Sequence, residues 1–170
     1  MLQLMGCRGE VEQADAFNPD NPLDAAASDA HLIVDPRSTS PVGLYQRDHV
    51  AGTDGLCVSG DEDGDSLRFG IVMHFGPTLV CEGSGSAAHS GASLSLRFDG
   101  ADCAIDAEYD GQRVQMPGTV PSGCAALCGE RASMSGGSMA RTGWTEADAQ
   151  QLRSRRDVLR NRASHALCEG

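Results

Sequence analysis

Short alternating segments separated by regularly spaced turns are the feature that most constrains the fold of this chain. Between Pro41 and residue 140, turn signals recur roughly every ten residues. Four of them are Asp-Gly pairs, which supply the positive φ angle that tight hairpin turns require. These pairs are Asp54-Gly55, Asp63-Gly64, Asp99-Gly100 and Asp110-Gly111, and residues 76–77, 83–91 and 117–118 add further turn signals. A chain that turns this often favours short strands joined by hairpins.

Between the turns, apolar residues alternate with polar ones. Leu94, Leu96 and Phe98 alternate with Ser95 and Arg97, and residues 67–73, 103–109 and 113–116 follow the same pattern. A period of two with one polar face is typical of antiparallel strands that bury a single side. With residues 42–48, 56–59, 79–82 and 132–139, the pattern predicts about eight strands. We therefore expect a mainly β fold, a small antiparallel up-and-down β-barrel, because closure removes the unpaired edges. A two-sheet β-sandwich is the alternative.

Six of the seven cysteines lie within or just after these segments. They are Cys57, Cys81, Cys103, Cys124, Cys128 and Cys168. They are widely spaced, none forms a Cys-x-x-Cys pair, and no His or Cys cluster has the spacing of a zinc site. This pattern predicts disulfide bonds and an oxidising compartment. The spacing leaves the connectivity open.

The seventh cysteine, Cys7, stands far upstream in the sequence Leu4-Met5-Gly6-Cys7. These four residues resemble the lipobox of a bacterial lipoprotein precursor. The resemblance implies that Cys7 is lipidated on its thiol and becomes the mature N-terminus, with residues 1–6 as the remainder of a truncated signal peptide. Arg8 follows in place of the aspartate associated with inner-membrane retention. The implied location is the cell envelope at the periplasmic face of the outer membrane, with a periplasmic or secreted soluble protein as the alternative.

The chain divides into four predicted parts. Residues 1–7 are the residual signal and anchor, and residues 8–40, with seven acids and two arginines, are a flexible acidic tether in which 31–34 could form a short strand. Residues 41–140 are the disulfide-bonded β-domain. Residues 141–170 contain a helix from Thr145 to about Leu167, predicted from the capping-box spacing of Thr145 and Asp148 and docked on the β-domain through a narrow apolar stripe. We expect Cys168 to be bonded to the body, to Cys124 or Cys128.

Charge and motif content exclude several functions. The chain has 24 acids against 13 basic residues, a net charge of −11, so nucleic-acid binding is not expected. Apolar runs are too short for a membrane-spanning helix, so membrane contact is expected only through the lipid anchor. The chain has no nucleophile elbow, P-loop or dinucleotide fingerprint, and its five histidines are scattered. We therefore predict no catalytic residue, cofactor or metal ligand, and a protein that is not an enzyme.

The acidic run at Asp61, Glu62, Asp63 and Asp65 is the sharpest local feature. An EF-hand loop beginning at Asp61 would need glycine and glutamate where Ser66 and Val72 stand, so that motif fails. The run is interpreted as a solvated hairpin tip or as the contact for a basic partner. The predicted function is a non-enzymatic envelope protein whose acidic β-domain binds such a partner, for example as an inhibitor of a basic hydrolase such as lysozyme. The alternative is a small-molecule or lipid carrier that uses the barrel interior.

Overall fold

The computed structural model describes residues 18, 20–33, 35–60 and 66–168. Cys7 and the acidic run at residues 61–65 therefore lie outside the described residues. The chain forms two units, residues 1–33 and residues 34–170, and each is described by itself. Among the described residues, no helix is both long and apolar enough to cross a lipid bilayer.

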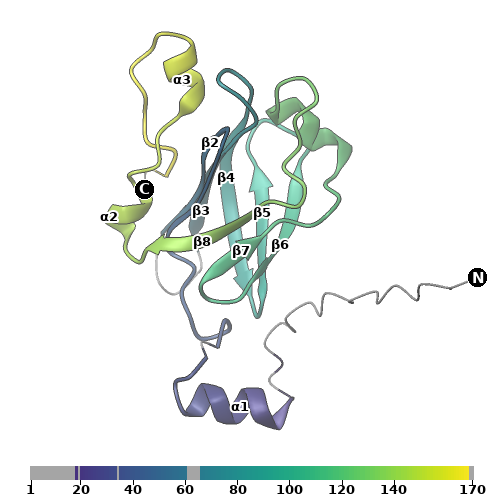
Figure 1. The fold of residues 1–170 in the computed structure, drawn as a ribbon, viewed down its shortest axis with the longest axis vertical. Coiled ribbons are helices and arrows are strands. Elements are labelled where there is room, and N and C mark those ends of the chain that lie inside the picture. The colour runs from purple at the N-terminus through teal and green to yellow at the C-terminus, as the bar shows by residue number, and fades with distance from the viewer. Residues whose placement is uncertain (1–17, 19, 34, 61–65, 169–170) are drawn as a thin grey trace, which may run out of the picture. The chain divides into compact units, whose positions relative to one another are not determined.

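The larger unit is a closed barrel of eight antiparallel strands (Figure 1). The strands are β1 (Gly43–His49), β2 (Gly52–Ser59), β3 (Leu67–His74), β4 (Val80–Ser90), β5 (Ser93–Phe98), β6 (Ala104–Tyr109), β7 (Arg113–Gln115) and β8 (Ser138–Gly143). Each strand pairs with its neighbours in the sequence, and β8 pairs with β1 to close the barrel. The predicted up-and-down barrel is confirmed, and the sandwich alternative is wrong.

Large apolar side chains fill the barrel interior. In β5 and β6 every second residue is buried, as the alternation predicts. Phe69 of β3 and Phe98 of β5 meet edge to face, with ring centroids 4.8 Å apart. Leu56, Ile71, Met73 and other fully buried side chains belong to the same cluster. The interior is therefore a packed core in its central layers.

Two predicted turns are instead parts of strands. Residues 83–90 belong to β4, which pairs with β3 from Leu67↔Ala87 to His74↔Val80 and with β5 from Gly85↔Phe98 to Ser90↔Ser93. Pairing on both edges satisfies the backbone of this small-residue segment, and it outweighs the local turn preference. Residues 54–55 lie within β2. The pairs at 99–100 and 110–111 do lie at turns between strands.

The C-terminal segment holds two short helices, α2 (Glu146–Ala149) and α3 (Arg155–Leu159). The predicted capping box is present, because Thr145 Oγ1 accepts from the Asp148 N–H while the Asp148 carboxylate accepts from the Thr145 N–H. The prediction of one helix to Leu167 is wrong. The backbone of Leu152 pairs with Leu167, and that of Ser154 pairs with His165. This antiparallel pairing breaks the helix and places α3 at the tip of a loop.

The C-terminal segment covers the outer face of β1, β2 and β3. Leu44, Cys57 and Val72 of these strands form a buried cluster with Ala149, Leu152 and Cys168. Two glycines permit this close approach, since a Cβ at Gly55 would overlap Leu152 and a Cβ at Gly70 would overlap Leu167. Gly55 is therefore required in the middle of a strand for packing.

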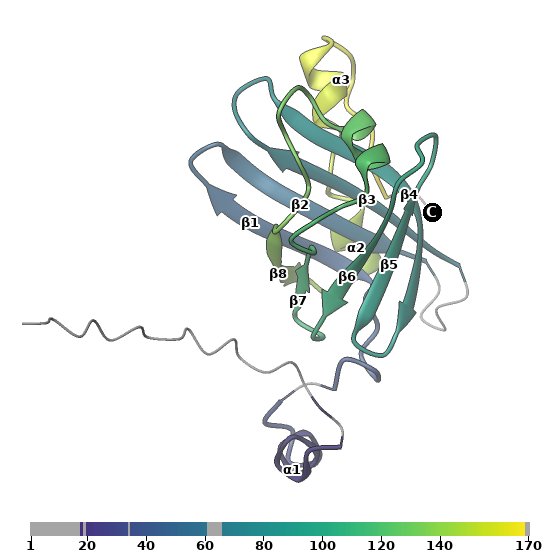
Figure 2. The ribbon, with the colours of Figure 1, turned by 90° about the vertical axis from the view of Figure 1, so that its right-hand side faces the viewer.

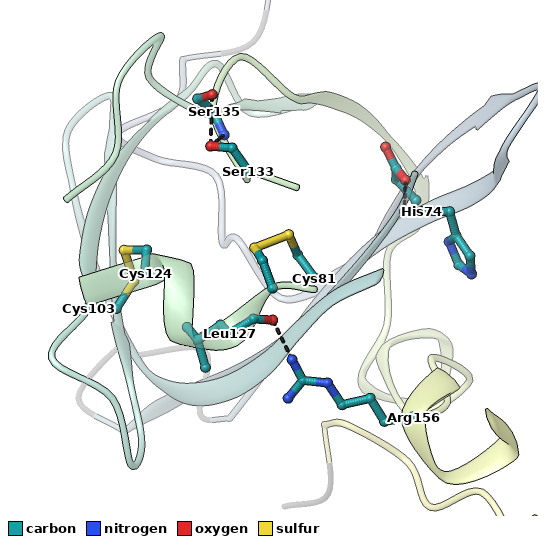
Figure 3. The surroundings of a disulfide bond; sticks show 10 residues. His74, Cys81, Cys103, Cys124, Leu127, Ser133, Ser135 and Arg156 are labelled. Carbon is teal, nitrogen blue, oxygen red and sulfur yellow. Dashed lines mark hydrogen bonds between the residues drawn. A yellow bond between two sulfur atoms is a disulfide. The ribbon is translucent and has the colours of Figure 1, made fainter. Parts of the chain in front are cut away.

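Three disulfide bonds pair all six predicted cysteines: Cys57–Cys168, Cys81–Cys128 and Cys103–Cys124. The expected bond from Cys168 to Cys124 or Cys128 is wrong. Residues 165–167 return along Leu152 on the outer face of β2, which brings Cys168 over Cys57. The other two bonds fix the 3-10 helix η1 (Ser122–Leu127) and its flank to the barrel (Figure 3). Both ribbon views place η1 and α3 near the same end of the barrel (Figures 1 and 2).

The smaller unit contains α1 (Pro22–Asp29), within the range predicted to be a flexible tether. Asn21 caps this helix by accepting from the Leu23 N–H, and Pro22 occupies the first turn, where a missing N–H is tolerated. None of the side chains of α1 is buried. Residues 31–33 form no strand, and residue 34 lies outside the described part of the chain.

Candidate functional site

An arginine of β8 lies among aromatic rings from β1, from β6 and from the residue that follows β8. We call Arg141, Tyr45, Tyr109 and Trp144 the arginine cluster. Arg141 is on the same face of β8 as buried Met139, so its side chain turns towards the barrel interior. Its Nη2 donates to the Ser40 carbonyl oxygen at 2.7 Å, to the Tyr109 hydroxyl at 2.6 Å and to the Tyr45 hydroxyl. The guanidinium thus joins three strands to the chain that enters β1.

No carboxylate neutralises this guanidinium among the described residues, since none forms a salt bridge with it. The carbon Cζ of Arg141 lies 4.3 Å from the ring centroid of Trp144 and 5.0 Å from that of Tyr45, within cation–π range. Burial raises the pKa of Tyr45 and of Tyr109, so both phenols stay neutral at physiological pH. Among the described residues, the positive charge is balanced by neutral oxygens and π faces.

A groove of about 460 Å³ lies against the arginine cluster. Its walls include residues 38–40, Gly60, Arg141, Trp144 and Glu146. Glu146 Oε2 accepts from the Gly60 N–H at 3.1 Å, which ties the start of α2 to the end of β2. Trp144 is 57% exposed, an unusual state for the only tryptophan of the chain.

A second polar cluster lies beside the β1–β2 turn, around the fully buried Asp54. Its carboxylate accepts from Arg47 Nε at 3.1 Å, His49 Nε2 at 2.9 Å and the His74 N–H at 2.7 Å. His49 Nδ1 accepts from the Ala51 N–H at 3.3 Å. Both ring nitrogens of His49 are therefore engaged, so this Asp–His pair is not arranged as a general base. Its geometry fits a structural role, the compensation of a buried carboxylate.

Glu82 of β4 holds the C-terminal segment on the outer wall. The side chain of Glu82 accepts from the Ser154 Oγ at 2.7 Å, the Arg155 N–H at 2.6 Å and the Arg156 N–H at 2.9 Å. Glu82 is only 5% exposed, so its charge is satisfied by these donors at the start of α3. Arg156 then donates to the Leu127 carbonyl oxygen of η1, as Figure 3 shows.

A row of carboxylates lies on the outer side of β6 and at the two chain segments that flank it. Asp102, Asp106, Glu108 and Asp110 are all exposed and alternate with buried residues. Asp106 accepts from the Ser95 hydroxyl, and Asp110 accepts from two backbone N–H groups of its own turn. None of the four forms a salt bridge within the described part of the chain. We call these four residues the acidic row.

The sequence-predicted partner contact at residues 61–65 and the predicted lipidation site Cys7 lie outside the described residues. Sequence reasoning missed Arg141, Asp54 and Glu82. A signal existed for Arg141, because it occupies an inward-facing position in the alternation of β8, where an apolar residue is expected. Asp54 was missed because Asp54-Gly55 has the sequence of a hairpin turn, so its side chain was not expected inside the barrel.

The described residues contain no group of three His, Cys, Asp or Glu side chains that could hold a metal ion. The buried carboxylates of Asp54 and Glu82 are satisfied by donors of their own clusters. We therefore take the acidic row and the groove as the candidate recognition surfaces. No family model, curated protein or solved structure matches the chain.

Proposed function

We propose that this chain is a non-enzymatic cell-envelope protein whose acidic β-domain binds a basic protein partner. The acidic row on β6 is the observation that carries the proposal. Asp106 and Glu108 project from β6 two residues apart, about 7 Å, while Asp102 and Asp110 are exposed just before and just after the strand. Carboxylates without salt bridges on a rigid strand attract lysine and arginine side chains of a partner.

The wider charge distribution supports the same proposal. Residues 41–140 carry thirteen acids and five arginines, a net charge of −8. A field of this sign speeds the encounter with a cationic protein and makes the association rate sensitive to salt. A basic hydrolase such as lysozyme has the required charge, and its inhibition is the specific form of the proposal.

The proposed location in the envelope is supported by two features. The three disulfide bonds are compatible with an oxidising compartment. The lipobox-like residues before Cys7 are compatible with an anchored precursor. A barrel joined to the membrane by the preceding residues would present its acidic row to proteins in the periplasm.

Binding of hen egg-white lysozyme to the full chain tests the proposal. We would compare the wild type with the triple variant Asp102→Asn/Asp106→Asn/Glu108→Gln by biolayer interferometry at low and physiological salt. The proposal predicts salt-sensitive binding that falls at least about tenfold in the triple variant, the loss of roughly 1.4 kcal/mol. A turbidity assay of lysozyme activity then tests inhibition.

A matched control removes the same number of charges from α1, in Asp20→Asn/Asp24→Asn/Asp29→Asn. This control should retain binding, because α1 lies outside the β-domain. A further variant neutralises Asp61, Glu62, Asp63 and Asp65 and asks whether the acidic run contributes. Absence of binding to lysozyme, or an equal loss in the α1 control, would contradict the proposed contact.

The carrier alternative has less physical support. A carrier needs space for its ligand inside the barrel, whereas Phe69, Phe98 and Met73 occupy the central layers. Arg141 and the two tyrosines fill the interior near the end of β8. A ligand there would have to displace packed side chains, which costs several kcal/mol.

A further inference from the structure

We propose that the groove beside the arginine cluster binds a saccharide that carries a carboxylate. The proposal concerns a different surface from the acidic row and stands independently of it. It rests on three observations made for the described residues: groups along the groove that lack hydrogen-bond partners, an exposed aromatic ring, and a guanidinium that forms no salt bridge.

Three polar groups in the groove have unused hydrogen-bonding capacity among the described residues. Arg141 Nη2 donates to three acceptors, while Nη1 has no hydrogen-bond partner. Glu146 uses Oε2 on the Gly60 N–H and leaves Oε1 free. The indole N–H of Trp144 makes no hydrogen bond, whereas its backbone N–H donates to Asp148. The groove thus offers two donors and one charged acceptor.

The guanidinium of Arg141 selects for an anionic group. Its Nε is buried without a partner, and no described carboxylate forms a salt bridge with it. A partly buried cation held only by neutral groups is costly, and a ligand carboxylate at Nη1 would compensate it. The negative charge of the ligand is therefore placed at the inner wall of the groove.

Glu146 and Trp144 indicate two further features of the ligand, a hydroxyl group and a ring that can stack. The Glu146 carboxylate on the wall of the same groove disfavours a bare inorganic anion, but its Oε1 accepts a hydrogen bond from a hydroxyl. Arg141 covers one face of the Trp144 ring, and the 57% exposure of this residue leaves apolar surface for stacking. A hydroxylated ring bearing a carboxylate meets all three requirements. The groove volume of about 460 Å³ lies within the range of small-molecule sites.

The fluorescence of Trp144 gives a direct readout, because it is the only tryptophan in the chain. The probe is N-acetylmuramic acid, an acidic sugar, titrated into the full chain at neutral pH. Its matched controls are N-acetylglucosamine, which lacks the carboxylate, and lactate and phosphate, which lack the sugar ring. The proposal predicts a saturable change for N-acetylmuramic acid and at least about tenfold weaker responses for the three controls.

Variants locate the binding. Glu146→Gln removes the charged acceptor and should weaken binding by about tenfold, whereas the exposed Glu130→Gln should leave it unchanged. Arg141→Lys tests the guanidinium, with thermal unfolding as the check on folding. Trp144→Leu changes an exposed side chain, so it keeps the fold, and calorimetry should show loss of binding. An equal response to N-acetylglucosamine, an equal response to lactate or phosphate, or no response to any probe would overturn the proposal.

Discussion

Glu82 is predicted to hold the C-terminal segment against the barrel, and its substitution tests the packing on the outer wall. The carboxylate accepts three hydrogen bonds, from one hydroxyl and two backbone N–H groups. Ser154, the residue that donates its hydroxyl, is 1% exposed, so water does not readily replace the lost acceptor. We compare Glu82→Gln with Glu82→Ala.

The expected magnitudes follow from the acceptors that each variant keeps. The glutamine oxygen can occupy the position of Oε2 and accept from Arg155 and Arg156, while the Ser154 hydroxyl rotates to accept from the amide. Only the charge assistance is then lost, and we expect about 1–2 kcal/mol. Alanine leaves three donors without an acceptor, and we expect about 3–5 kcal/mol.

Denaturant unfolding at pH 7 measures both losses, with the exposed Glu130→Ala as a control that should change little. Hydrogen exchange locates the effect along the chain. The Cys57–Cys168 bond keeps the C-terminal segment attached to β2 even when its other contacts loosen, so a local opening is seen as faster exchange. Exchange should accelerate at residues 153–160 and stay slow in β5 and β6. A Glu82→Ala variant within about 0.5 kcal/mol of wild type, or unchanged exchange at residues 153–160, would refute the reasoning.

Three further predictions concern the same wall. The variant Cys57→Ala/Cys168→Ala should lose about 5 kcal/mol in denaturant unfolding, because the bond spans 111 residues; a loss below about 1 kcal/mol would contradict that role. Gly70→Ala should cost about 1–3 kcal/mol by overlap with the C-terminal segment, and an unchanged thermal midpoint would oppose the packing described. Hydrogen bonds from the Thr145 hydroxyl and from nearby backbone N–H groups lower the pKa of Asp148, so its stabilising effect is present above the ordinary carboxyl pKa and is lost as pH falls through the lowered value. Thermal midpoints should show wild type above Asp148→Asn at pH 7 and the two converging at pH 2; a constant difference would speak against the linkage.

The alternation of apolar and polar residues was sufficient to predict the barrel. Burial in β5 and β6 follows the sequence pattern residue by residue, because their outer faces meet solvent. The pattern is weaker in β2 and β3, where the inner face is buried in the barrel core and the outer face under the C-terminal segment. Strand assignment by alternation therefore works best where nothing covers the sheet.

Long-range contacts decided what local sequence could not. Gly55 follows an aspartate and has the sequence of a turn, yet it lies in a strand that pairs with both β1 and β3, and Leu152 packs where its side chain would be. The capping box correctly predicts where α2 begins, but it contains no information on the backbone pairing that ends the helix early. That pairing also determines the position of Cys168, which explains the wrong disulfide expectation.

The residues of the candidate sites could not be predicted from local sequence for a related reason. Arg141 and Asp54 are polar residues at inward-facing positions. The tyrosine partners of Arg141 lie 32 and 96 residues away in the sequence, and the carboxylate of Asp54 is also bound by the His74 N–H of the next strand. The carboxylates of the acidic row were visible as polar members of an alternating strand. That they lack salt bridges follows from the neighbouring strands, since Asp106 and Glu108 lie opposite Ser95 and Ser93.

Disulfide mapping of the full-length protein by mass spectrometry tests the central structural claim most directly. Digestion without reduction should yield linked peptides for Cys57–Cys168, Cys81–Cys128 and Cys103–Cys124. The Cys57–Cys168 link requires the C-terminal segment to fold back over β2, and the other two links require η1 and its flank to lie against the barrel. Free thiols at these positions, or a link from Cys168 to Cys124 or Cys128, would contradict the account.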